Sequence, residues 1–229
     1  MLHVDPVLLR REAGPTQPFY EPAPGSGLGF SLVPMGACLP FARNAEIYAE
    51  DEPAEYLYMV AKGAVRSYKL LSDGRRQIEA FYLPGDLFGI EAGDKHRFSA
   101  EAISGSTVWV VKRSVVDRVA QRDSAVAREL WMLAAQHLER AQDHLLLLAR
   151  HKAHERIAAF LLEMAKRSGD AEGEVELPMA RQDIADYLGL TIETVSRTFT
   201  EMVHAATISL RSTRRVLLRD RAALARLNA

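Results

Sequence analysis

Three polar side chains near the C-terminus have the types and the spacing needed to recognise base pairs. Glu193, Ser196 and Arg197 lie at i, i+3 and i+4, which places them on one face of a helix. An arginine there can donate two hydrogen bonds to guanine O6 and N7, and a glutamate can accept one from cytosine N4. The alternative is a Glu193–Arg197 ion pair on a solvated face, worth about 0.2–0.5 kcal/mol. We predict that the three residues contact DNA bases.

The segment around them, residues 181–200, has the pattern of a helix-turn-helix. Ala185 is small where two steeply crossing helices approach, and Gly189 suits the tight turn that follows. Thr191 is a candidate N-cap of the second helix. Apolar residues close the corner, namely Ile184, Leu188, Leu190 and Val195, and Thr198 is the weak core position. The alternative is a helical corner of purely structural role, but the number of matched positions favours a motif whose second helix enters the major groove.

Basic and hydroxyl side chains around this motif are predicted to contact DNA phosphates. Two apolar runs, Ile208–Leu210 and Val216–Leu218, flank a basic turn and predict a β-hairpin wing suited to phosphates. The predicted phosphate contacts are Arg181, Gln182, Thr191, Thr194, Arg211 and Arg214. From residue 177 to 229 there are eight arginines, no lysine and five acidic residues, so the local charge is +3 while the whole chain carries −1. This segregation favours a DNA-binding C-terminal module.

A long helix is expected before this module, from Ser124 to about Leu148, without proline or glycine. Small and apolar residues recur on one of its faces at spacings of three and four: Leu130, Ala134, Leu138, Ala141, Leu145 and Leu148. Such a stripe predicts dimerisation through a coiled coil, and the alternative is a helix packed only on its own domain. His137 and His144 beside the stripe are expected to be partly buried polar residues rather than metal ligands.

The elements that precede the long helix have the texture of a small β domain. Gly63, Gly74 and Gly85 are spaced by 11 residues, which is a normal hairpin rhythm, and 72–74 and 83–86 are turn signals. The whole pattern predicts an α+β chain of four parts. These are a proline-rich tail over 1–27, a β domain over 28–118, a dimerisation helix over 119–150 and a DNA-binding domain over 151–229, whose first helix starts near Ala153.

Other classes of function are not favoured by the composition. The single cysteine, Cys38, excludes an intramolecular disulfide, a cysteine zinc site and a four-cysteine iron–sulfur site. Cys38 itself is either a small hydrophobic residue or a redox-sensitive thiol. The sequence has no glycine-rich phosphate loop, His-Glu-x-x-His helix or Gly-x-Ser-x-Gly elbow, so no enzyme and no metal site are predicted.

No membrane segment is expected either. The longest aliphatic stretch, Leu145–Ala149, is far shorter than the roughly 20 residues of a membrane span. The N-terminal region has no apolar segment of the length found in signal peptides. We therefore expect a cytoplasmic protein.

In its order of elements and in three motifs the chain resembles the CRP/FNR superfamily of bacterial transcription regulators. The motifs are Leu83-Pro-Gly-Asp86, Ala185-x-x-x-Gly189 and Glu193-Thr-Val-Ser-Arg197. The resemblance implies a β-roll similar to cyclic-nucleotide-binding domains, a dimerisation helix and a winged helix-turn-helix. It further implies a homodimeric activator that binds inverted repeats and recruits RNA polymerase through surface loops that include Ile78–Leu87. The Glu-x-x-Ser-Arg triplet is similar to the FNR branch, which implies TTGA-type half-sites.

The sensors of that superfamily are not matched. FNR proteins hold an iron–sulfur cluster with several cysteines, whereas this chain has only Cys38. Gly85-Asp86 and His96-Arg97 stand roughly where the nucleotide pocket of CRP has Gly-Glu and Arg-Ser. No cofactor is predicted. The chain therefore looks most like the FixK group, regulators of micro-oxic respiration and nitrogen fixation. The alternative is a ligand-gated regulator whose roll binds a small molecule or haem. Ala206 stands where relatives usually have glycine, so the bend before the wing is expected to differ.

Overall fold

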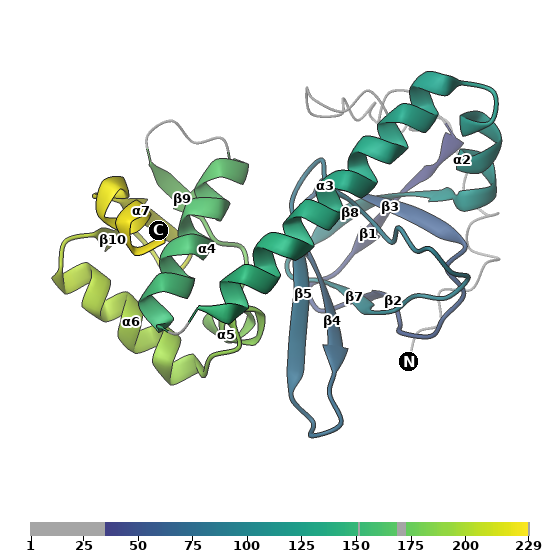
Figure 1. The fold of residues 1–229 in the computed structure, drawn as a ribbon. Coiled ribbons are helices and arrows are strands. Elements are labelled where there is room, and N and C mark those ends of the chain that lie inside the picture. The colour runs from purple at the N-terminus through teal and green to yellow at the C-terminus, as the bar shows by residue number, and fades with distance from the viewer. Residues whose placement is uncertain (1–34, 151, 169–172, 229) are drawn as a thin grey trace.

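A computed structural model describes residues 35–150, 152–168 and 173–228. The predicted tail over 1–27 lies outside these residues. The chain has an α+β fold in which a sheet domain and a helical C-terminal domain lie on either side of the long helix α3, Ser124–Ala149 (Figure 1). We call strands β1–β8 the roll and residues 153–228 the C-terminal domain.

The roll consists of two four-stranded antiparallel sheets. The first has the order β1-β8-β3-β6 and the second the order β2-β7-β4-β5. The strands are β1 (Ala37–Phe41), β2 (Glu46–Tyr48), β3 (Tyr56–Lys62), β4 (Val65–Leu70), β5 (Arg76–Tyr82), β6 (Leu87–Phe88), β7 (Ser99–Ala102) and β8 (Ser106–Lys112). The predicted turns are present, since Gly74 N donates to Leu71 O at 2.9 Å and Asp86 N donates to Leu83 O at 2.9 Å. Gly74 has φ = 84°, which explains the glycine there.

The roll is closed by α2 (Arg113–Ala120) and by the first half of α3. Val116 and Val126 are buried against Trp109 and Met59, and the partly buried Leu130 packs against this cluster. Asp123 caps α3, because its Oδ1 accepts from Ala125 N at 2.9 Å. The predicted long helix is thus confirmed within one residue of its expected end.

The C-terminal domain is built on α4 (Ala153–Ser168), followed by α5 (Arg181–Leu188), α6 (Ile192–His204) and α7 (Arg221–Asn228). Its sheet has the order β10-β11-β9, with β9 Glu174–Glu176, β10 Ile208–Leu210 and β11 Arg215–Leu218. The wing predicted from two apolar runs is confirmed as β10 and β11. The third strand, β9, and the last helix, α7, were not predicted, because neither is long enough to show a periodic pattern.

Candidate nucleic-acid interface

The corner between α5 and α6 has the geometry of a helix-turn-helix. Gly189 ends α5 with φ = 62°, the left-handed conformation that favours glycine, and Leu190 N donates to Ala185 O at 3.0 Å. Ala185 is fully buried where the helices approach. Thr191 caps α6 as predicted, because its Oγ1 accepts from Thr194 N at 3.2 Å.

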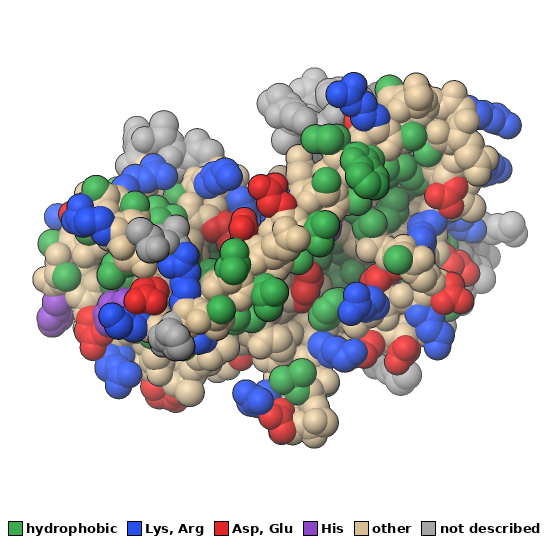
Figure 2. Space-filling view, viewed as in Figure 1, with side chains coloured by type: hydrophobic (Ala, Val, Ile, Leu, Met, Phe, Trp, Pro, Cys, Tyr) green, Lys and Arg blue, Asp and Glu red, His purple; other side chains and the backbone are tan. Residues whose placement is uncertain are grey.

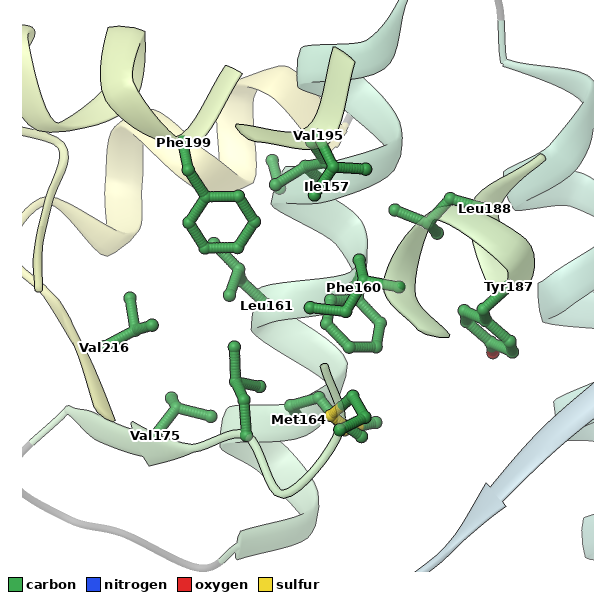
Figure 3. Packing of buried hydrophobic residues seen from close by; sticks show 14 of the residues in the cluster. Ile157, Phe160, Leu161, Met164, Val175, Tyr187, Leu188, Val195, Phe199 and Val216 are labelled. Atoms are coloured by element: carbon green, nitrogen blue, oxygen red, sulfur yellow. The ribbon is translucent and has the colours of Figure 1, made fainter. Parts of the chain in front are cut away.

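The inner face of α6 is held by the core of the C-terminal domain. Val195, Phe199 and Met202 are at most 2% exposed and lie beside Ile157 and Leu161 of α4, as the first two do in Figure 3. The weak core position is buried too, since Thr198 is 2% exposed. Truncating Phe199 to alanine in such a core costs roughly 3–5 kcal/mol, so the inner face fixes how α6 sits.

The outer face of α6 presents the three predicted base contacts to solvent. Glu193, Ser196 and Arg197 are all exposed. The hydrogen bonds of its own backbone N–H and of the Thr191 side chain lower the pKa of Glu193, so it is an acceptor at neutral pH. The Glu193–Arg197 ion pair considered above is not what the structure shows. Arg197 Nε lies 4.0 Å from Oε1 of Glu201 instead, one turn further along α6.

Glu201 also links α6 to α4. Its Oε2 lies 3.0 Å from Nε2 of His154 at the start of α4. Neither residue was singled out from the sequence, because the contact between Glu201 and His154 depends on the crossing of two helices. The carboxylate therefore lies between His154 and Arg197, and the arginine remains 71% exposed.

The predicted phosphate contacts within the helices differ in their surroundings. Gln182 Nε2 donates to Asp186 Oδ1 at 2.7 Å, and the hydroxyls of Thr191 and Thr194 lie 3.1 Å apart. Arg181 stacks its guanidinium 3.3 Å above the ring of Phe199. Burial lowers the pKa of Arg181 to about 10, so it remains charged at neutral pH. Its Nη1 is buried without a hydrogen-bond partner.

The wing carries the other predicted phosphate contacts. Arg211 is exposed and Arg214 is partly exposed, and both stand in the turn between β10 and β11. Ser212 Oγ holds that turn by accepting from Arg214 N at 3.2 Å and Arg215 N at 3.1 Å. The turn therefore presents its basic side chains outward from an ordered backbone.

The bend between α6 and the wing is made by an alanine. Ala206 has φ = 55°, a left-handed conformation that costs a residue with a Cβ about 1–2 kcal/mol. Ala206 thus adopts a conformation that glycine takes without this cost, and a bend different from that of relatives stays a prediction. Its position is held by the hydrogen bonds from Ala206 N to Val203 O and from Thr207 N to Met202 O, both 3.0 Å long.

The predicted stripe on α3 divides between two environments. Ala134, Leu138, Ala141 and Leu145 face solvent, with Leu138 59% and Leu145 69% exposed, whereas Leu130 and Leu148 pack on cores of their own chain. Trp131, which the sequence analysis missed, is 73% exposed. Trp131, Leu138 and Leu145 are spaced by seven residues, and this heptad spacing is the sequence signal that could have identified Trp131. Figure 2 shows hydrophobic side chains in a row along α3.

The two histidines beside this stripe serve the intramolecular packing. His144 Nε2 lies 2.9 Å from Tyr187 O, and its ring stacks on that of Tyr187 with centroids 4.0 Å apart. His137 is partly buried beside Tyr82. Among residues 35–150, 152–168 and 173–228, no group of three histidine, cysteine or acidic residues is arranged to hold a metal ion.

Two of the positions compared with a nucleotide pocket, Asp86 and His96, are engaged by the chain itself. Asp86 Oδ1 accepts from Arg140 at 3.0 Å and Asp86 Oδ2 from Arg167 at 2.6 Å. Burial alone raises the pKa of Asp86, but the two arginines outweigh burial and lower it. His96 is 2% exposed and stacks on Tyr48 with ring centroids 3.6 Å apart. Asp86 and His96 are thus parts of the internal packing.

The packing of the roll bears on two further predictions, the surface loop at Ile78–Leu87 and the redox role of Cys38. The stretch Ile78–Leu87 is not the surface loop that was expected: Ile78, Phe81, Tyr82 and Leu87 are buried because the stretch includes β5, and Pro84 is its one exposed residue. Cys38 in β1 is partly buried, and desolvation raises the pKa of its thiol. A raised pKa reduces the thiolate fraction and so disfavours the interpretation of Cys38 as a redox thiol.

Family models match both halves of this structure. A model of the cyclic nucleotide-binding domain matches residues 38–123, and a model of the Crp-like helix-turn-helix domain matches residues 155–227. The nitrogen fixation regulation protein FixK of Azorhizobium caulinodans is 55% identical over 202 residues, which are 86% of this chain and 82% of that protein. The protein of that name in Rhizobium meliloti is 49% identical over 75% of this chain and 77% of that protein. The chain belongs to the CRP/FNR family.

The structural comparison places it near the FixK regulators. The structure of FixK2 from Bradyrhizobium japonicum superposes with a TM-score of 0.81 at 52% identity, covering 85% of this chain and 98% of that one. This member of the CRP/FNR family is a DNA-binding transcription regulator of the FixK group and not an enzyme. No helix in the described part of the chain has both the length and the hydropathy needed to cross a membrane.

Proposed function

We propose that this regulator is a homodimer that activates transcription from inverted repeats of TTGA-type half-sites. The observation that carries the proposal is the outer face of α6, where Glu193, Ser196 and Arg197 are exposed together on the second helix of the helix-turn-helix. Arg197 would donate to guanine O6 and N7, and Glu193 would accept from cytosine N4. Because a single half-site offers few such contacts, recognition of two half-sites by a symmetric dimer increases both affinity and selectivity.

Dimerisation is supported by the exposed face of α3. Trp131, Leu138 and Leu145 repeat at intervals of seven and are 73%, 59% and 69% exposed. Large apolar side chains in a row on a soluble helix are typical of an interface. Small residues, Ala134 and Ala141, lie between them and allow two helices to approach. A second copy of α3 in a coiled coil is the occupant we propose.

The remaining contacts follow from the positions of the basic side chains. Phosphate contacts are proposed for the predicted set, namely Arg181, Gln182, Thr191, Thr194, Arg211 and Arg214. Arg211 and Arg214 are free to approach the backbone from the wing. A polymerase-binding surface is proposed at the turn around Pro84, the exposed part of the expected stretch. Binding to chromosomal DNA supports a cytoplasmic location, and the proposed division of the chain remains 28–118, 119–150 and 151–229.

The proposed targets are genes of micro-oxic respiration or nitrogen fixation. Relatives at 55% and 49% identity carry the name nitrogen fixation regulation protein. A ligand-gated regulator is the second candidate, because the roll matches the cyclic nucleotide-binding model. The internal pairing of Asp86 with Arg140 and Arg167 supports the ligand-free regulator instead.

The test is selection of bound sequences from a random DNA pool by purified protein without added ligand. We expect enrichment of an inverted repeat with TTGA-type half-sites at one spacing. Enrichment of isolated half-sites would contradict the dimer, and no enrichment unless a small molecule is added would favour the ligand-gated regulator.

A further inference from the structure

A buried ion cluster joins the roll to the first helix of the helix-turn-helix. The Asp183 cluster, as we call it, consists of Arg66, Arg76, Glu101, Asp183 and Asp186. Asp183 Oδ1 accepts from Arg66 Nη1 at 2.9 Å and from Arg76 Nη2 at 2.7 Å. The side chains of Arg66 and Asp183 are only 8% and 5% exposed. Figure 1 shows α5 on the side of the C-terminal domain that faces β5.

Arg66 and Asp183 are each also held within their own domain. Arg66 Nη2 lies 2.9 Å from Glu101 Oε2 of β7, which fixes the arginine from the roll side. Asp183 Oδ2 accepts from Ala180 N at 3.1 Å and so caps α5 while Oδ1 binds the arginines. Neither side chain can move without losing a contact inside its own domain. The cluster therefore fixes the position of α5 relative to the roll.

A second row of contacts runs along the same helix. Arg76 Nε donates to Asp186 Oδ2 at 2.8 Å, one turn after Asp183. Gln77 Nε2 donates to Tyr187 O at 3.3 Å. Contacts at positions 183, 186 and 187 of α5 oppose its rotation about its own axis as well as its translation. The pairing of Asp183 and Asp186 with one guanidinium adds directional restraint, because the guanidinium is a rigid planar donor.

The cluster restrains geometry more than it adds stability. Buried ion pairs lose much of their Coulomb energy to desolvation, but they tolerate few arrangements, because a misplaced charge stays buried and unpaired. The helix α5 packs on α6 through the fully buried Ala185, Leu188 and Val195. A fixed α5 therefore means a fixed orientation of α6 relative to the roll and α3.

We propose that Arg66 and Arg76 are positioning residues for DNA recognition, which hold α5 by Asp183 and Asp186 and thereby set, without any ligand, where α6 lies relative to α3. This inference rests on the proposed dimer, in which the position of α6 relative to α3 determines the distance between the two recognition helices. In this proposal the ion pairs fix the orientation of the C-terminal domain, a role that a bound effector has in a ligand-gated regulator. Its loss leaves each domain folded but widens the range of distances between recognition helices.

The test compares Arg76→Gln with the matched control Arg75→Gln. Arg75 is the neighbouring residue of the same hairpin, and its guanidinium pairs with Asp73 of that hairpin. Each protein is titrated with the palindrome of preferred spacing and with palindromes whose spacer is longer or shorter by a base pair. The preference is the ratio of the affinity for the native spacer to the affinity for an altered spacer. We expect Arg76→Gln to reduce this ratio about tenfold, which is a typical size of energetic coupling between two sites of a protein. Arg75→Gln should keep the wild-type preference, and Arg76→Lys should recover part of it.

Spacer preference separates positioning from a general loss of stability. If Arg76→Gln weakens binding to all three spacers by one factor, the ion cluster is merely structural and the proposal is wrong. If the variant binds the native spacer more tightly, the cluster restrains a state that does not bind DNA, which also overturns the proposal. Circular dichroism checks that the variants are folded.

A measurement without DNA keeps the inference separate from the proposed function. Spin labels at Lys62 in the roll and Thr200 on α6, both exposed, report the distance between the domains when Cys38 is replaced by serine. Labelled chains are diluted with unlabelled protein so that only distances within a chain contribute. We expect a broader distribution for Arg76→Gln than for wild type or Arg75→Gln. An unchanged width overturns the positioning role even if the wild type proves not to bind palindromes.

Discussion

The helices α3 and α6 both have one face that the chain buries and one that it leaves open, but the open faces differ in chemistry. The inner face of α6 carries Phe199 and Met202, each 2% exposed, and its outer face carries charged and hydroxyl side chains. The outer face of α3 instead carries Leu138 and Leu145, at 59% and 69% exposure. A polar face with a bidentate donor suits DNA, whereas an apolar face suits another protein surface.

The comparison shows that the burial of each face within the chain distinguishes a core face from a binding face better than the periodicity of apolar residues does. Both helices show apolar residues at spacings of three and four, and periodicity alone does not distinguish a core face from an interface. Only α6 places the whole of its apolar stripe in the core of its own domain. The apolar residues of α3 that stay exposed support the proposed contact with a second copy.

Replacing Leu138 with aspartate should have the largest effect, because it buries a charge in the proposed interface. We expect monomers and a loss of affinity for the palindrome of roughly 10²–10⁴-fold, since two half-sites no longer bind as one unit. Sedimentation and gel-shift titration measure both results. Gln136→Asp adds the same charge at another exposed position of α3 and should leave the dimer intact. A Leu138→Asp variant that is still dimeric at micromolar concentration would show that α3 is not the interface.

Arg197→Ala tests the polar face of α6. We expect a loss of about 1–3 kcal/mol per half-site and a flattened preference at one base pair, because a bidentate guanine contact is removed. The protein should remain a folded dimer, since Arg197 is 71% exposed. Binding to the best site and to its single-base variants measures the effect. Glu201→Gln is the control, because it removes the partner of Arg197 on α6 and leaves the arginine. Uniform weakening on all sequences by Arg197→Ala would mean that Arg197 contacts phosphate.

Arg214→Ala in the wing should have a smaller effect without sequence preference. Removing one phosphate contact is expected to weaken all sequences about equally and to reduce the slope of log affinity against log salt by up to ~1 per subunit. Titrations over a salt series check this result beside the Arg197→Ala data. An altered base preference with an unchanged salt slope would assign Arg214 to base recognition.

Cyclic AMP should have no effect, because Asp86 is paired with Arg140 and Arg167 and His96 is buried beside Tyr48. Gel-shift titrations with and without the nucleotide are expected to superimpose. A tenfold gain in affinity on adding it, about 1.4 kcal/mol of coupling, would establish a ligand-gated regulator.

Much of the site was predictable because its signals are local. Gly189, Thr191 and the buried residues of α6 all belong to one short stretch of the sequence, 189–202, and the structure places them as the sequence predicted. The alternative ion pair considered for Arg197 had Glu193 as its partner, whereas the structure places Arg197 beside Glu201. Both glutamates lie four residues from the arginine, so spacing alone does not choose between them, and the pair with Glu201 is joined by His154 from another helix.

The sequence by itself determined the succession of a glycine-punctuated sheet domain, a long apolar-striped helix and a helix-turn-helix, because turns, caps and helical periodicity act over a few residues. It also determined which polar residues lie together on α6. Only the tertiary structure decided which residues of the α3 stripe stay exposed and that Asp86 is bound by Arg140 and Arg167. It alone brought Asp183 to Arg66, 117 positions away in the chain. Such pairs depend on how two domains pack, and no local spacing records that packing.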